Sequence, residues 1–268
     1  MLVIFRQGSR QMMELEICVD SVESAIAADE GGAQRVELCS ALSEGGLTPS
    51  LGMLRAVRGA VKLGVYVMIR PRGGDFLYSE TEFGIMLDDI ARAGEAGADG
   101  VVFGLLTTQG EVDVERTARL VEAARPMEVT VHRAVDMARE LNVAMEGAIA
   151  AGAHRILTSG AAATALQGSG RIASLVRQAA GRIGIMVGGN VRPRNLAQVV
   201  AGTGASQFHT ALRTKVPSPM EFRNAKLRLG DADGDEYVRY RVLTPDVRHL
   251  REAMDQMDQV ATSGVRGA

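Results

Sequence analysis

Side chains that can do chemistry stand at the ends of short apolar runs in the first part of this chain. Glu16 and Cys18 close one such run, and Glu37 and Cys39 close the next. Two residues that lie two positions apart share one face of an extended strand. Carboxylates can act as general bases, and thiolates can bind a soft metal ion. The two cysteines can equally be small buried hydrophobic residues with weak S–H donors.

Cationic and imidazole groups stand at the ends of further apolar runs. Arg70, His132 and His209 each close a run, and Arg72 follows two residues after Arg70. An arginine can hold an anionic group, and a histidine near a carboxylate can donate or accept a proton. We therefore expect Glu37, Arg70 and His132 to be the candidate catalytic residues. The candidate substrate-binding residues are Glu16, Arg72, Asp136, Ser159, Gly188, Gly189 and His209.

These residues can meet only if the runs that carry them lie side by side. Between Met13 and His209, a short β-branched run is followed by an amphipathic helical stretch eight times. Strands that alternate with helices predict a parallel sheet, and eight such units predict an α/β fold, the TIM-like (β/α)8 barrel. Active groups in this fold lie at the carboxyl ends of the strands. The predicted strands are 14–19, 35–39, 64–70, 99–104, 127–132, 155–158, 183–187 and 205–209.

Alternation within the strands predicts which side chains point into the barrel. In the first strand the odd-numbered residues are apolar and are expected to pack under the helices, so that Glu16 and Cys18 face the interior. The same alternation directs these residues of other strands inward: Glu37, Cys39, Arg70, Thr130, His132 and His209. Because buried carboxylates need a cationic partner, we expect Arg70 to neutralise them. The whole set can also be read as an ion-pair cluster that only orders the core.

Length, charge and cysteine content limit the class of protein. The chain has 268 residues, enough for one barrel domain, and we expect residues 13–268 to form it and residues 1–12 to be a flexible extension. The 30 Lys and Arg nearly balance the 32 Asp and Glu, which argues against a nucleic-acid partner. No apolar run reaches the ~18 residues that span a bilayer. We expect a cytoplasmic protein without a membrane partner, and its two cysteines as reduced thiols or ligands.

The C-terminal part of the chain breaks the alternating pattern. Residues 216–241 are irregular and contain an acidic patch at 231–236, and Thr244-Pro245 opens a last amphipathic helix. The acidic patch begins like a calcium loop, but Glu236 stands where the turn needs glycine and Val242 where the bidentate glutamate belongs. We therefore expect a solvated loop, followed by a helix that caps the barrel or meets a neighbouring subunit.

Several long segments resemble the copper homeostasis protein CutC family. The similarity extends from about residue 13 to the terminal helix, and residues 1–12 lie outside it. One difference is Asn190, which stands where the family tends to have the second glycine of a Gly-x-Gly turn after the seventh strand; asparagine tolerates the positive φ of such a turn. The segments that carry the resemblance are 15–21 (LEICVDS), 32–39 (GAQRVELC), 44–50 (EGGLTPS), 68–76 (MIRPRGGDF), 130–137 (TVHRAVDM), 157–160 (LTSG), 218–224 (SPMEFRN) and 235–240 (DEYVRY).

The resemblance implies a cytoplasmic TIM-like barrel, often a homo-oligomer, with a role in copper homeostasis. Cys18 and Cys39 are expected at matching heights on neighbouring strands, which lie about 4.8 Å apart. Two inward thiolates at this spacing can share one soft, low-coordinate ion such as Cu(I). We therefore expect Cu(I) as the ligand and Cys18 and Cys39 as the metal-binding residues.

An enzymatic function is the alternative. The loops after strands seven and eight of such barrels often hold a phosphate, and Gly188-Gly189-Asn190 can offer backbone N–H groups there. If Arg70 held the anionic group, Glu37 or Glu16 could act as the base and His132 as the acid. Such a site would suit an isomerase or lyase acting on a small phosphorylated or carboxylated metabolite. A third reading is a barrel that binds or assembles without turnover.

Overall fold

Eight parallel strands close into one barrel in a computed structural model of the chain, which describes residues 12–224, 226–227 and 235–264. Each strand pairs with the next in sequence, and the last pairs with the first. The strands are β1 (Glu14–Val19), β2 (Arg35–Leu38), β3 (Gly64–Met68), β4 (Gly100–Phe103), β5 (Glu128–Val131), β6 (Arg155–Thr158), β7 (Gly184–Val187) and β8 (Gln207–Thr210). The predicted (β/α)8 barrel is confirmed.

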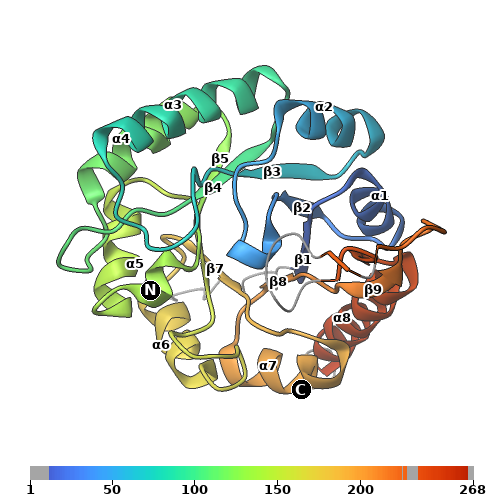
Figure 1. The fold of residues 1–268 in the computed structure, drawn as a ribbon. Coiled ribbons are helices and arrows are strands. Elements are labelled where there is room, and N and C mark those ends of the chain that lie inside the picture. Colours follow the sequence, from blue (N-terminus) through green and yellow to red (C-terminus); the bar gives the residue numbers. More distant parts are fainter. Residues whose placement is uncertain (1–11, 225, 228–234, 265–268) are drawn as a thin grey trace, which may run out of the picture.

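Helices form a ring around the barrel, and the first seven each connect one strand to the next (Figure 1). Serine side chains begin several of them; Ser79, for example, accepts the backbone N–H of Glu82 while the Glu82 carboxylate accepts that of Ser79. The helices are α1 (Val22–Glu30), α2 (Leu51–Ala60), α3 (Glu80–Glu95), α4 (Val114–Ala124), α5 (Leu141–Ala150), α6 (Ser169–Ala179), α7 (Pro193–Thr203) and α8 (Thr244–Gly264), with two short 3-10 helices, η1 (Leu42–Glu44) and η2 (Arg133–Met137).

The strands follow the predicted alternation of faces. Leu15, Ile17 and Val36 are completely buried and belong to the large apolar core between the strands and the helices. Cys18 and Cys39 belong to a separate, smaller cluster together with Tyr66, Met68 and Val102. The residue types therefore divide the strands into an apolar outer face and an inner face that carries sulfur and polar groups.

A packed polar layer fills the end of the barrel where the strands begin. Two guanidinium groups lie over the Tyr66 ring, with Cζ of Arg35 and of Arg155 at 5.5 Å and 5.1 Å from the ring centroid. The Tyr66 hydroxyl donates to Glu128 Oε2 at 2.6 Å, and the same carboxylate forms an ion pair with Arg155. Gly100 makes room for the ring, because a Cβ there would lie 2.2 Å from it.

The C-terminal part adds a small sheet and the last helix. β9 (Thr214–Pro217) and β10 (Val238–Arg241) pair antiparallel, and α8 lies against α1 and α7, completing the ring of helices. Val247, Leu250 and Met254 of α8 are fully buried, which confirms the predicted terminal helix. The predicted extension 1–12 lies, except for Met12, outside the described residues, as do residues 231–234 of the acidic patch. None of the helices in the described part of the chain combines the length and apolar character needed to cross a membrane.

Candidate functional site

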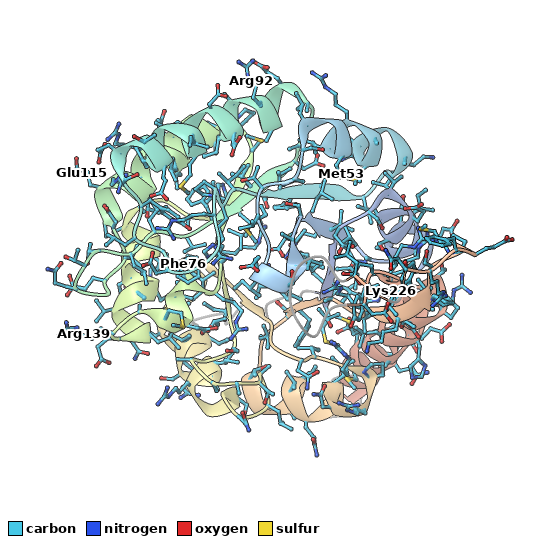
Figure 2. The ribbon with its side chains drawn as sticks, in the orientation of Figure 1. Met53, Phe76, Arg92, Glu115, Arg139 and Lys226 are labelled. Carbon is cyan, nitrogen blue, oxygen red and sulfur yellow. The ribbon has the colours of Figure 1, made fainter. Side chains whose placement is uncertain are left out.

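A cavity of about 420 Å³ opens at the carboxyl end of the barrel. Figure 2 shows Phe76, one of its lining residues, inside the ring of helices, whereas Arg92, Glu115 and Arg139 lie on its outer edge. Six of the candidate site residues line this cavity: Cys18, Glu37, Arg70, His132, Asp136 and His209. The other lining residues are Glu44, Gly45, Met68, Gly74, Phe76, Arg133, Met137 and Leu157. Side chains from strands distant in sequence therefore do share one inner space.

The two thiols lie together: Cys18 lines the cavity, and Cys39 is buried beside it outside the lining. The Sγ atoms of Cys18 and Cys39 are 3.8 Å apart, and Cys39 Sγ is 3.5 Å from Glu37 Oε2. Both cysteines are free and buried. The strand register explains the arrangement, because Cys18 pairs with Glu37 across β1 and β2 and Cys39 follows on the same inner face. Ligand atoms of Cys18, Glu37 and Cys39 all lie within 4.8 Å of one another.

His209 connects this cluster to a buried carboxylate below it. Its Nδ1 is 2.7 Å from Glu16 Oε1, and its Nε2 is 3.9 Å from Glu37 Oε2. Burial opposes the charge on Glu16, but the hydrogen bond with His209 and the charge of Arg35 lower the pKa of Glu16 to about 2. Burial likewise opposes the charge on His209, but the nearby Glu37, Cys18 and Glu16 raise the pKa of His209 well above its usual value. At neutral pH we therefore assign a carboxylate to Glu16 and an imidazolium to His209.

Thiol and carboxyl groups around His209 divide into charged and neutral members. A hydrogen bond from Cys39, with the nearby His209, lowers the pKa of Cys18 to about 5 in spite of burial. The same bond and burial raise the pKa of Cys39 well above its usual value. Burial and the charge of Cys18 raise the pKa of Glu37 in the same way. Cys18 is therefore the thiolate and Cys39 keeps its proton at neutral pH, whereas Glu37 ionises less readily than an ordinary carboxyl group.

Arg70 lines the predicted cavity but does not pair with the buried carboxylate of Glu16. Its Nη1 donates to the carbonyl oxygen of Glu44 at 2.7 Å, and its Nη2 donates to that of Gly74 at 2.7 Å. The expectation that Arg70 neutralises the buried carboxylates is wrong for Glu16, which pairs with Arg35 Nε at 2.7 Å and with His209. Arg70 lies two residues beyond the end of β3, so its guanidinium is at the level of the loops, whereas Arg35 is the register partner of Glu16.

His132 is a buried histidine whose proton position follows from its contacts. Its Nδ1 accepts the backbone N–H of Ala134 at 3.2 Å, so the neutral ring carries its proton on Nε2. Burial, followed by the charge of Arg70, lowers the pKa of His132 to about 3, and the ring is therefore neutral at pH 7. A Cβ at Gly104 would lie 2.6 Å from Nδ1, so this glycine leaves room for the ring.

Asp136 organises the loop after β6. Its carboxylate accepts the backbone N–H groups of Ser159 and Ala161, both at 2.9 Å, and the hydroxyl of Thr158. Arg133 Nε donates to the same carboxylate at 2.8 Å. Burial would raise the pKa of Asp136, but the hydrogen bonds from Thr158, Arg133 and these amides lower it. The backbone N–H groups of Ser159 and Ala161 are thus occupied by the protein's own carboxylate, and that of Gly160 by the Thr158 hydroxyl.

Five predicted substrate-binding residues do not line the cavity: Glu16, Arg72, Ser159, Gly188 and Gly189. Glu16 and Ser159 are completely buried, and Arg72 Nε donates to Glu82 Oε1 at 2.6 Å in the loop outside the cavity. Gly188 is packed against Leu157, and its N–H donates to Thr158 O at 2.9 Å. Asn190 has a φ of 59°, so the residue after Gly189 adopts the left-handed conformation although it is not a glycine.

Sequence reasoning missed part of the lining and part of the charge balance. Glu44 ends η1, Phe76 lies in a loop and Met137 ends η2, where no periodic pattern indicates which way a side chain points. Arg35 could have been found, because it shares the inner face with Glu37 on the same strand.

Comparisons with known proteins agree on one family. The sequence profile of the CutC family matches residues 13–214. A family protein CutC from Chromobacterium violaceum is 50% identical over 242 residues, 90% of this chain and 98% of that protein. A human copper homeostasis protein cutC homolog is 48% identical over 225 residues, 84% of this chain and 82% of that protein.

A solved structure agrees with this result. It is a crystal structure of a Streptococcus agalactiae protein that carries the provisional name copper homeostasis protein CutC. It superposes with a TM-score of 0.70 at 34% identity, covering 74% of this chain and 98% of that one. Sequence and structure comparisons therefore point to the same family.

Proposed function

The chain belongs to the CutC family, and from this premise we propose that it acts in copper homeostasis by binding Cu(I) through Cys18 and Cys39. The observation that carries the proposal is the 3.8 Å separation of the two buried Sγ atoms. Thiolates are soft ligands that favour Cu(I), and relatives named for copper homeostasis support the choice of ion.

The distance between the sulfurs favours a third ligand. With thiolate–metal bonds of about 2.3 Å, as in zinc sites, sulfurs 3.8 Å apart would subtend roughly 110° at the ion. This angle is far from linear, so a further donor is needed, and Glu37 Oε2 lies 3.5 Å from Cys39 Sγ. Because Cys39 holds its proton without the ion, binding would release that proton and would weaken as the pH falls.

The test is an anaerobic titration of reduced protein with Cu(I) delivered from a competing chelator. We expect about one Cu(I) per chain, and Cys18→Ser or Cys39→Ser should each weaken binding by roughly 100-fold or more, because each removes one of two thiolates. Met53→Leu, which removes a sulfur from α2 outside the cavity, should leave binding unchanged. Equal affinity of a double serine variant and the native chain would refute the proposal.

Two further properties follow from this proposal. We infer a reducing compartment, the cytoplasm, because thiols 3.8 Å apart are close enough for oxidation to a disulfide elsewhere. We also infer a homo-oligomer. The connection between β9 and β10 exposes three large apolar side chains, Met220, Phe222 and Leu227, which are 56%, 74% and 57% exposed. This is more exposed apolar surface than a solvated loop needs.

The isomerase or lyase alternative has less support. The loop amides after β6 are occupied by Asp136, and the N–H of Gly188 already has an acceptor. In the described part of the chain, the cavity lining contains no lysine for Schiff-base chemistry.

A further inference from the structure

The cavity above the thiols is larger than a metal ion requires. Its volume of about 420 Å³ falls within the ~300–1,000 Å³ of pockets that hold small organic molecules. We propose that it binds a small carboxylate with an apolar body, whose oxygen accepts a hydrogen bond from His132 Nε2–H. This inference goes beyond the binding of Cu(I), and its test does not depend on the metal.

His132 presents a buried donor without a partner. The side chain is only 5% exposed, and its Nδ1 is used by the backbone N–H of Ala134. Its Nε2 finds no hydrogen-bond partner among the described residues, although the residue lines the cavity. A buried polar group left without a partner costs free energy, so such a donor indicates a ligand oxygen.

The charge around this donor favours an anion. Arg70 is 5% exposed and forms no ion pair within the described residues; its guanidinium is held by carbonyl oxygens and lies 5.0 Å from the centroid of the Phe76 ring. Arg133 lines the cavity as well, paired with Asp136. The carboxylate of Glu44 belongs to an exposed residue at the rim, where solvent screens its charge. The Cys18 thiolate in the same cavity is balanced by the His209 imidazolium, so the uncompensated buried charge beside His132 is that of Arg70.

The remaining walls define the rest of the ligand. Phe76, Met68, Leu157 and Met137 surround the cavity with apolar and aromatic groups. The Phe76 ring also contacts His132, with centroids 5.0 Å apart. A phosphate would need several converging N–H donors, whereas the neighbouring loop amides are occupied by Asp136. One neutral N–H donor beside a buried cation and apolar walls fits a monocarboxylate better.

The test uses metal-free, full-length protein and two monocarboxylate probes, benzoate and 4-methylpentanoate. Binding is followed by calorimetry and by the NMR signal of the His132 Nε2–H proton. We expect one probe per chain and a shift of that signal, with neutral benzamide binding roughly tenfold more weakly or not at all.

A matched pair of variants separates the donor from the fold. His132→Asn keeps an oxygen that can accept the Ala134 N–H but loses the Nε2 donor, and it should weaken binding roughly tenfold or more. His154→Asn is the control, because His154 is exposed and its Nδ1 also accepts a backbone N–H, that of Val129. Circular dichroism verifies that both variants fold.

Three results would overturn the proposal. The first is that neither carboxylate saturates the protein by about 10 mM, which corresponds to a binding free energy weaker than ~3 kcal/mol. The second is that His132→Asn binds the carboxylates as tightly as the native chain does. The third is that inorganic phosphate competes for the site as well as benzoate does. Because no copper is present, none of these results bears on Cu(I) binding.

Discussion

His132 makes the stability of the protein depend on pH. Its pKa is lowered from the usual 6.5 to about 3, chiefly by burial. Between these pH values the unfolded chain binds a proton that the folded chain does not, so His132 reduces the free energy of unfolding as the pH falls, by up to about 1.4 kcal/mol per pH unit.

We predict that His132→Asn removes this contribution. In urea unfolding at pH 7, 6, 5 and 4, the free energy of unfolding of the variant should rise relative to that of the native chain by about 1 kcal/mol per pH unit below pH 6. His154→Asn, at an exposed position, should run parallel to the native chain. If His132→Asn also ran parallel, His132 would not be neutral in the folded protein.

At this scale the sequence could predict which side chains face inward, but not which of them pair. Strand alternation placed Glu16, Cys18 and Glu37 on the inner face correctly. Pairing depends on the height of each group along the barrel axis, and this height is set by strand register. Arg35 and His209 therefore took the role expected of Arg70, because they lie level with Glu16.

Among the elements, the packing of α8 on α1 can be tested at one glycine. Gly31 has an ordinary φ of −82°, but a Cβ there would lie 2.4 Å from Cβ of Val247. Gly31→Ala should therefore cost about 1–3 kcal/mol of unfolding free energy through overpacking alone.

A double-mutant cycle measures this contact. Adding Val247→Ala to Gly31→Ala should cost less than the sum of the single changes, because the smaller side chain makes room for the new methyl group. Gly59→Ala on α2 is the control: a Cβ there would meet nothing within 4 Å, and alanine favours the helix. Additive costs would show that α8 does not pack on α1 as described.

Elements with a clear period were predicted well, and irregular ones were not. β1 and β6 have the predicted bounds, and β8 begins two residues later than predicted because Ala205 and Ser206 precede the ladder. η2 went unrecognised, since a short 3-10 helix lacks a periodic apolar face. It carries Asp136, so its absence from the prediction also hid how the loop after β6 is held.

For the whole molecule, we predict an oligomer that the excursion between β9 and β10 helps to form. Light scattering should give a mass above the 28.4 kDa of one chain, and Phe222→Asp should shift the equilibrium towards the monomer, because Phe222 is 74% exposed and a charge in an apolar interface is costly. Arg92→Asp, on the outer surface of α3, is the charge-changing control. A native chain that is monomeric at all concentrations would contradict the prediction.

The layer formed by Tyr66, Arg35 and Arg155 limits the path by which an ion can enter and leave the barrel. All three side chains are buried, with 6–7% exposure, so this end of the barrel offers no passage between the strands. An ion held by the sulfurs must then leave by the mouth through which it entered. The ion would be delivered and released through the same cavity mouth, so a carrier protein would have to bind at that mouth both to deliver the ion and to remove it.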